Sequence, residues 1–273
     1  MLSFMMNRWN CTGDRQTEEM ERAGLLQIGI SAQLPAWLRA KLAGKARVCL
    51  YDSGLAADAC SEVEIDQAIS DAQALLAQTL MLSAGGSCDW GRDEREAAAA
   101  MAEIQRKCRE KGMGVALTNR RAYRPEMPVE AEKLLRLCRQ TGCEIAFDSG
   151  FSHAYGRCLE DFHDLHERIA FLLMNDNYGK EVACWSVGHS DFDPTILPDD
   201  FRQPGYGTAP YPALGEAMRQ YGMEIPLLIN GMRHQNAALE VVMRETRRLL
   251  AGKVFINPAG GKIGRDWHTD RML

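Results

Sequence analysis

The chain has 273 residues and a formal net charge of −5, with acidic and basic residues mixed along its length. It is long enough to bury one large core, it has no apolar run long enough to span a bilayer, and it has no basic stripe to neutralise a nucleic-acid backbone. Its nine cysteines are scattered without a Cys-x-x-Cys pair, so we expect a soluble protein of the reducing cytoplasm, with neither membrane nor nucleic acid as partner.

Short apolar segments rich in β-branched residues alternate with segments of helical periodicity along the whole chain. The apolar segments have the length and composition of strands that are buried on both faces. In chain order, the predicted strands are 2–6, 25–30, 47–51, 79–83, 114–118, 144–147, 170–174 and 225–229. The amphipathic helices predicted after them are 17–23, 35–42, 62–77, 93–111, 128–140, 159–168, 211–221 and 236–250.

Glycines follow most of these predicted helices, at the position where a left-handed residue commonly ends a helix. They are Gly24, Gly44, Gly112, Gly142, Gly222 and Gly252. Eight β-then-α units without linkers predict an α/β protein, a (β/α)8 barrel over residues 1–252, with a C-terminal extension at 253–273 that packs on the barrel or on a partner subunit. The rival is an open Rossmann-like sheet, but no glycine-rich phosphate fingerprint follows the first strand.

One connection, residues 175–210, is far longer than the others. In a barrel it leaves the carboxyl end of the seventh strand, at the face where active sites are built. Long loops in compact domains are usually functional. It carries His189 together with Asp191 and Asp193, whose spacing fits either a metal contact or a solvated turn, and it also carries Trp185.

Three stretches carry a resemblance to a known group of barrels. They are Phe147-Asp148-Ser149-Gly150 followed by His153-Ala154-Tyr155, then Arg168-Ile169 leading into Met174-Asn175-Asp176-Asn177, and Pro204-Gly205-Tyr206-Gly207 before Tyr211-Pro212-Ala213-Leu214. In their order and spacing the chain resembles the xylose-isomerase-like TIM-barrel superfamily, the sugar phosphate isomerase and epimerase group, over almost its whole length. The resemblance implies a sugar-like substrate at the carboxyl mouth of the barrel.

The resemblance also implies one divalent ion held by a glutamate after strand five, an aspartate after strand six, a histidine near strand seven and a glutamate after strand eight. The two glutamates move a proton between adjacent carbons in that family. Here they fall on Thr118 and Asn230, neither of which is a base. Asp148 and Asp176 keep the family's aspartates. The metal site is therefore degenerate, and whether the protein is an enzyme stays open.

A rebuilt site for one manganese, zinc or magnesium ion draws on Asp148, Asp176, His153 and His189, because carboxylates and imidazoles are suitable ligands. A mouth without metal is the favoured alternative. In that case the aspartates bond loop amides, and His153 is a packed rim histidine. His153 and His189 are also the candidate catalytic bases.

Ligand contacts are expected from the same mouth. Asp148 and Asp176 belong to this set, and Asn119 and Asn230 can hydrogen-bond a ligand hydroxyl or each other. Arg120 and Arg233 can clamp a carboxylate or phosphate, or else pair with surface carboxylates. Two aromatic residues that can stack on a sugar face are Trp9 and Trp185.

Three functions follow from these residues. The first is a sugar isomerase or epimerase with an altered site, acting on a sugar-like or acidic metabolite. The second is a catalytically silent barrel that binds a small molecule or a partner protein, and the third is a metal-independent lyase or dehydratase with a histidine base. We also expect a homodimer. An endonuclease role is disfavoured because only six histidines are present and the net charge is negative.

Overall fold

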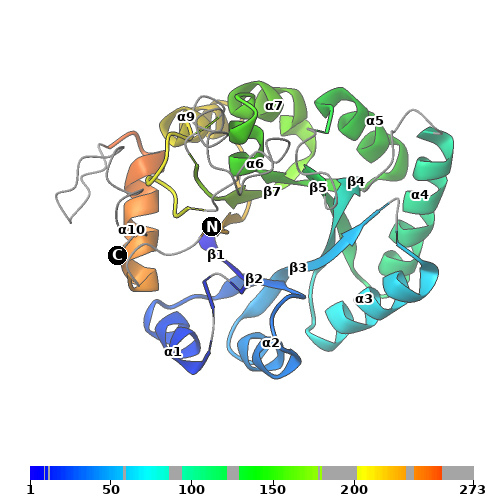
Figure 1. Ribbon diagram of the computed structural model, residues 1–273, viewed down its shortest axis with the longest axis horizontal. Coiled ribbons are helices and arrows are strands. Elements are labelled where there is room, and N and C mark those ends of the chain that lie inside the picture. Colours follow the sequence, from blue (N-terminus) through cyan, green and yellow to red (C-terminus); the bar gives the residue numbers. More distant parts are fainter. Residues whose placement is uncertain are drawn as a thin grey trace, which may run out of the picture.

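The computed structural model describes residues 1–8, 10–11, 13–57, 60–85, 94–121, 129–177, 179, 202–231 and 237–253. Eight parallel strands form a closed barrel in chain order, with helices around its outside (Figure 1). The strands are β1 Leu2–Met6, β2 Gln27–Ser31, β3 Arg47–Ala56, β4 Thr79–Gly85, β5 Gly114–Arg121, β6 Glu144–Asp148, β7 Ile169–Met174 and β8 Leu227–Ile229. The predicted TIM barrel is confirmed.

The helices surround the barrel in chain order, so that each one covers the strands beside it (Figure 1). They are α1 Asp14–Arg22, α2 Ala36–Ala43, α3 Glu62–Ala74, α4 Glu94–Glu110, α5 Ala131–Thr141, α6 Ser149–Ala154, α7 Cys158–Leu165, the 3-10 turn His166–Arg168, α9 Tyr211–Gln220 and α10 Leu239–Leu250. None of the helices in the part of the chain that is described combines the length and apolar character that a membrane span needs.

The strands pair where the apolar sequence pattern predicts, but β3 and β5 continue further toward the mouth. In β3 the pairing reaches Ala56, which lies opposite Ser83, and in β5 it reaches Arg121, which lies opposite Gly85. The apolar pattern ends earlier because these extensions begin with polar side chains, Asp52 and Ser53 in β3 and Asn119 and Arg120 in β5. Backbone pairing does not depend on that polarity, so the sheet continues into a polar rim.

Two local predictions need correction. The segment after β6 was expected as a strand end followed by loop, but Ser149–Ala154 forms the short helix α6. Six residues are too few for a helical period to be visible in the sequence. Gly44 ends α2 with φ −71°, an ordinary right-handed conformation, whereas Gly24, Gly112, Gly142, Gly222 and Gly252 have the positive φ that was predicted.

The barrel interior is filled by an apolar cluster of side chains that point inward from the strands. Its members include Met5, Leu50, Met81, Ala116, Ala146, Leu173 and Leu228. A second and larger cluster lies between the strands and the helices, and includes Phe4, Ile30, Phe147 and Leu172. We call the first cluster, inside the barrel, the plug. Because the plug fills the interior, a ligand site has to lie above it, at the mouth.

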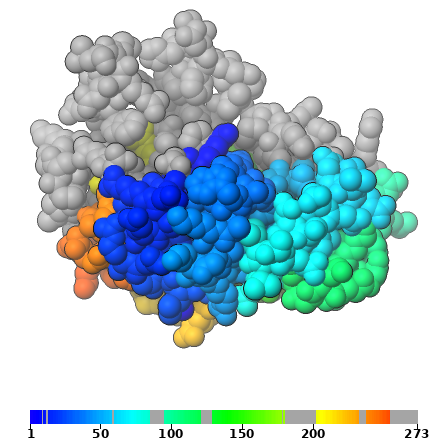
Figure 2. Space-filling view, turned by 90° about the horizontal axis from the view of Figure 1, so that it is seen from below, coloured from blue at the N-terminus to red at the C-terminus, as the bar shows by residue number. Residues whose placement is uncertain are grey.

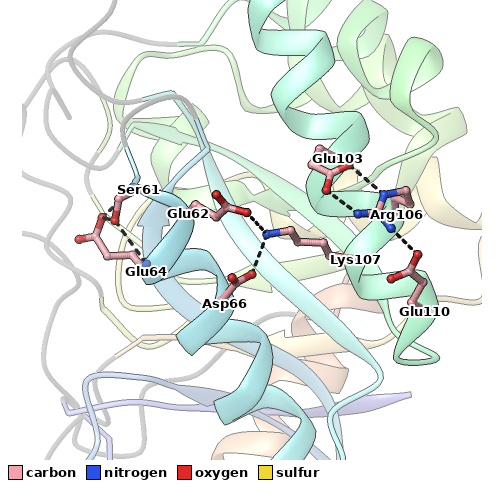
Figure 3. A network of polar contacts seen from close by, with 8 residues as sticks. All are labelled: Ser61, Glu62, Glu64, Asp66, Glu103, Arg106, Lys107 and Glu110. Atoms are coloured by element: carbon pink, nitrogen blue, oxygen red, sulfur yellow. Dashed lines mark hydrogen bonds and ion pairs between the residues drawn. The ribbon is translucent and has the colours of Figure 1, made fainter.

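Charged side chains connect neighbouring outer helices. Figure 2 shows α1, α2 and α3 side by side on the outside of the first half of the chain. In Figure 3, Lys107 of α4 reaches across to Glu62 and Asp66 of α3, with Nζ 2.8 Å from a carboxylate oxygen of each. Arg106 of α4 instead pairs within its own helix, with Glu103 and Glu110. These ion pairs lie in the outer helix layer, and none of their residues belongs to the mouth.

Candidate functional site at the mouth of the barrel

A polar residue stands two positions after the inward plug residue of every strand. On β2 the plug position is Gly29. Since side chains alternate between the two faces of a strand, these polar residues continue the inward face at the mouth. They are Asn7, Ser31, Asp52, Ser83, Thr118, Asp148, Asn175 and Asn230. All are buried except Asp52, which is half-buried. We call this set the polar ring.

One side of the polar ring is closed by its own hydrogen bonds. Asn7 follows β1 and Asn230 follows β8, and the Nδ2 of Asn7 donates to both the carbonyl oxygen and the Oδ1 of Asn230, at 3.0 and 2.9 Å. Asn230 was predicted to contact a ligand or Asn119. Its side-chain oxygen instead bonds Asn7 across the seam where the barrel closes.

Asp176 holds the loop that precedes α9. Its Oδ1 accepts from the backbone N–H groups of Asn177 and Ala209, both at 2.9 Å, and its Oδ2 accepts from those of Gly205 and Gly207, at 2.8 and 3.0 Å. The carboxylate is almost fully buried, and burial raises its pKa to about 6 although the four N–H groups favour the charged form. Four donors occupy its lone pairs, so its observed role is to position the Gly205–Gly207 turn.

His153 lies at the end of α6 and faces the same loop. Its Nε2 is 3.0 Å from Oγ1 of Thr208, and a side chain placed on Gly179 would meet that ring at 3.1 Å. Burial lowers the pKa of the half-buried imidazole, which favours its neutral form. These contacts match the packed rim histidine that was the alternative to a ligand or a base.

Asn119 points toward the helix layer and ties β5 to β6. Its Oδ1 accepts from the backbone N–H of Asp148 at 2.6 Å, and its Nδ2 donates to the carbonyl of Asp148 at 3.1 Å and to Ser152 at 2.8 Å. The structure therefore does not bring Asn119 together with Asn230. It uses Asn119 to fix the backbone that carries Asp148.

The opposite side of the polar ring has unused polar atoms. Asp148 is the N-cap of α6, and its Oδ1 accepts from the N–H of Phe151 at 3.0 Å. Its Oδ2 is fully buried without a hydrogen bond from any described residue, and the same is true of Oγ1 of Thr118. Nη1 of Arg120 lies 3.9 Å from that Oδ2, which is near enough for ionic attraction and too far for a hydrogen bond.

A second carboxylate belongs to this group. Asp52 of β3 and Asp148 both interact electrostatically with Arg120, and the charge of Asp52 raises the pKa of Asp148. Burial is the larger cause, and it raises the pKa of each carboxyl, while the guanidinium lowers both. We call Asp52, Thr118, Arg120 and Asp148 the open sector. Strands β3, β5 and β6 contribute to it (Figure 1).

Asp52 was not among the candidates drawn from the sequence. It lies one residue beyond the predicted strand 47–51, where the search for motifs of the family gave it no role. The signal that finds it is the recurrence of a polar residue two positions after the inward apolar residue of each strand. That recurrence becomes visible once the register tells which residues point inward.

The described residues do not fit the proposed metal site. Among them no group of three histidine, cysteine, aspartate or glutamate side chains comes together. Asp176 is saturated by amides and His153 contacts Thr208. Of the oxygens of Asp148 and Asp176, the one left over, Oδ2 of Asp148, already faces a guanidinium. Four further candidates, Trp9, Trp185, His189 and Arg233, lie outside the described residues.

Another hollow lies at the far end of the barrel. It has a volume of about 510 Å³ and is bordered by Leu2, Met218, Leu227 and Leu250. Its lining is mainly apolar and includes Arg219, Glu224 and Arg247 at the edge. Because no buried unsatisfied polar atom faces it among the residues described, the mouth remains the better candidate site.

No protein-family model and no curated protein matches the chain. Solved structures do match. The IOLI protein, solved with a zinc atom, has a TM-score of 0.68 at 15% identity over 93% of this chain and 99% of its own. The 3-keto-D-glucoside 4-epimerase YcjR from E. coli has a TM-score of 0.65 at 12% identity over 91% and 98%.

A third match is the probable 3-DHS dehydratase AsbF from Bacillus anthracis, with a TM-score of 0.62 at 13% identity, over 91% of this chain and 97% of its own. Structural relatives of the chain thus include a sugar epimerase and a dehydratase. At such low identity the likeness shows the fold alone, which is a TIM barrel.

Proposed function

We propose that this xylose isomerase-like TIM barrel is a sugar isomerase- or epimerase-like protein that binds a small polyhydroxylated metabolite in the open sector. The observation that carries the proposal is the gap of 3.9 Å between Nη1 of Arg120 and the buried Oδ2 of Asp148. A ligand hydroxyl fits such a gap, because it can accept from the guanidinium and donate to the carboxylate. The hydroxyl of Thr118 offers a further partner.

The charges of the open sector favour a hydroxyl-rich ligand over a strongly anionic one. Arg120 lies 3.9 Å from Asp148 and interacts electrostatically with Asp52, and these two carboxylates offset its positive charge. The sequence alone suggested an anionic ligand, because arginines stand near the places of the missing glutamates. With Arg120 paired, a phosphate or carboxylate on the ligand has to be held by other residues.

Proton transfer in this sector falls to Asp148. Burial raises the pKa of this carboxyl, which brings it closer to the range where a group can take up and return a proton near neutral pH. When a carboxylate removes a proton from the carbon beside a carbonyl, an enolate forms and negative charge develops on the ligand's carbonyl oxygen. The guanidinium of Arg120 is placed to stabilise that charge.

Deuterium exchange tests the proposal without knowledge of the product. Ketoses and keto-sugars are incubated with the protein in D2O, and NMR follows loss of the signal from the proton beside the carbonyl. We expect exchange with at least one sugar and none with Asp148→Asn. Asp164→Asn on the exposed face of α7 is the matched control and should exchange like the unmodified protein.

Binding is measured separately by calorimetry with the same sugars. Asp148→Asn should weaken binding about tenfold, since it replaces a charged acceptor of a hydroxyl by an amide. Phosphorylated sugars should bind no more tightly than their neutral parents. Failure of every sugar to bind, or equal affinity of Asp148→Asn and Asp164→Asn, would show that the open sector is not the site.

A silent binding barrel is the second candidate. It is favoured by Thr118 and Asn230, which stand in place of the two proton-shuttling glutamates, and by the bond that occupies Asn230. It predicts binding that depends on Asp148 without any deuterium exchange.

A histidine-based lyase predicts activity that survives Asp148→Asn and is lost with His153→Gln. A homodimer and a packing role for residues 253–273 also remain proposals.

A further inference from the structure

We infer that the guanidinium of Arg120 takes the cation position of this mouth, so the protein binds its ligand without a divalent ion. This role follows from the charges of the open sector, whichever sugar binds there. Asp52 and Asp148 each have one oxygen bonded to a backbone N–H, from Gly54 and Phe151 respectively, both at 3.0 Å.

Among the residues that the structure describes, the oxygen that remains on Asp148 is the best acceptor in the mouth for a cation. It is fully buried, it has no hydrogen bond from the described residues, and it continues the inward face above Ala146. Nη1 of Arg120 already lies 3.9 Å from it. A divalent ion bound to this oxygen would stand within a few ångströms of a fixed positive charge, and the two would repel each other strongly in a buried site.

The position of Arg120 in β5 explains how the guanidinium reaches this oxygen. Ala116 points into the plug, and Thr118 continues that face at the mouth. Thr118 stands where the resemblance implies a glutamate ligand, and its hydroxyl is too small to replace that carboxylate. The pairing of β4 with β5 becomes irregular beyond Thr118, and Arg120 follows in this irregular stretch, with Nη1 3.9 Å from Oδ2 of Asp148. One short residue and one long cation thus replace a ligand and its metal.

The guanidinium can do part of what a metal does. It donates hydrogen bonds to carbonyl, hydroxyl or enolate oxygens, and its charge is not lost at any ordinary pH. Asp148 lies 3.9 Å from it, and the charge of Asp52 also acts on it, as the carboxylates of a metal site act on an ion. The side chains of the open sector therefore suit an oxygen-rich ligand and do not suit a cation.

The test is metal binding by the intact protein and by variants of Arg120. The unmodified protein is incubated with Mn²⁺ or Zn²⁺, desalted and analysed for metal. We expect no stoichiometric ion. Arg120→Gln keeps most of the side-chain length and removes the charge, so it should bind Mn²⁺ at least about tenfold more tightly than the unmodified protein, measured by the EPR signal of free Mn²⁺.

Arg120→Lys keeps the charge and is the matched control, with no gain in Mn²⁺ affinity expected. Adding Asp148→Asn to Arg120→Gln should cancel the gain. If Arg120→Gln does not fold, Arg120→Ala is used, and methylguanidinium should then compete with Mn²⁺. One ion per chain in the unmodified protein, lost in Asp148→Asn, would overturn the inference. So would equal Mn²⁺ affinity of the unmodified protein and the uncharged variant.

Discussion

Asp148 and Asp176 follow neighbouring strands and have opposite surroundings. Asp176 accepts four backbone N–H groups, and its oxygens have no room for another partner. Asp148 accepts from Phe151 at one oxygen, and its other oxygen faces Arg120 across a gap. Both are buried, so burial does not separate them. What separates them is the number of donors, which makes Asp176 a structural residue and leaves Asp148 for chemistry.

An amide at position 176 tests this assignment. Asp176→Asn keeps the shape of the side chain, but its NH2 group cannot accept from Gly205 and Gly207 and would point a donor at two donors. We expect a loss of roughly 2–4 kcal/mol in the free energy of unfolding, measured by urea denaturation. The exposed Asp164→Asn should change it by less than about 0.5 kcal/mol. Equal stability of the two variants would contradict the bonding of Asp176.

At the scale of elements, the mouth depends on the close approach of α6 to the end of β7. Ser149 donates from Oγ to the carbonyl of Leu173 at 3.0 Å. A Cβ on Gly150 would lie 2.4 Å from Nδ2 and 2.6 Å from the carbonyl oxygen of Asn175. Only glycine permits this contact, because the second of these atoms belongs to the backbone and cannot move alone.

Gly150→Ala should therefore push α6 away from β7. We expect destabilisation of about 1–3 kcal/mol, with weaker sugar binding because α6 begins at Asp148. Gly44→Ala is the control. Its φ is −71° and its Cβ would meet the nearest atom, the carbonyl oxygen of Lys41, at 3.5 Å, so stability should stay the same or rise slightly. Calorimetric melting of both variants checks the contrast.

Across the whole barrel, two parts of the mouth differ: the seam, where β8 meets β1, and the open sector. At the seam, β8 has only three residues, paired from Leu2↔Leu227 to Phe4↔Ile229. Asn7 and Asn230 add the hydrogen bonds that close this seam at the mouth. The open sector lies on β3, β5 and β6. Two of these, β3 with ten residues and β5 with eight, are the longest of the eight strands, and β5 pairs with β4 from Thr79↔Gly114 to Gly85↔Arg121.

Asn7→Ala should weaken the seam selectively. Removing its two hydrogen bonds to Asn230 should cost about 2 kcal/mol and leave the Oδ1 of Asn230 without this donor. Hydrogen exchange followed by mass spectrometry should show faster exchange in β1 and β8 and little change in β4 and β5, since local opening starts where pairing is shortest. A uniform increase over all strands would mean that the barrel opens as a single unit.

Much of the fold was determined by the sequence itself. The eight apolar segments predicted every strand, because a strand buried on both faces must be almost entirely apolar. Five of the six glycines after helices were predicted with the conformation that they have. Asp148, Asp176 and His153 were found as mouth residues because Asp148 ends β6, Asp176 stands two residues after β7, and His153 lies in the helix that follows β6.

Tertiary structure alone decided what these residues do. The sequence could not show that four amides, three of them about thirty positions away, converge on Asp176, or that Asn230 bonds Asn7 across 223 positions. Nor could it reveal that the charge of Arg120 acts on Asp52, because β3 and β5 lie on either side of β4 only in the folded sheet. Apolar periodicity is a local property of the chain and can be read along it. The charge and hydrogen bonding of a polar group depend on partners that only folding brings within a few ångströms.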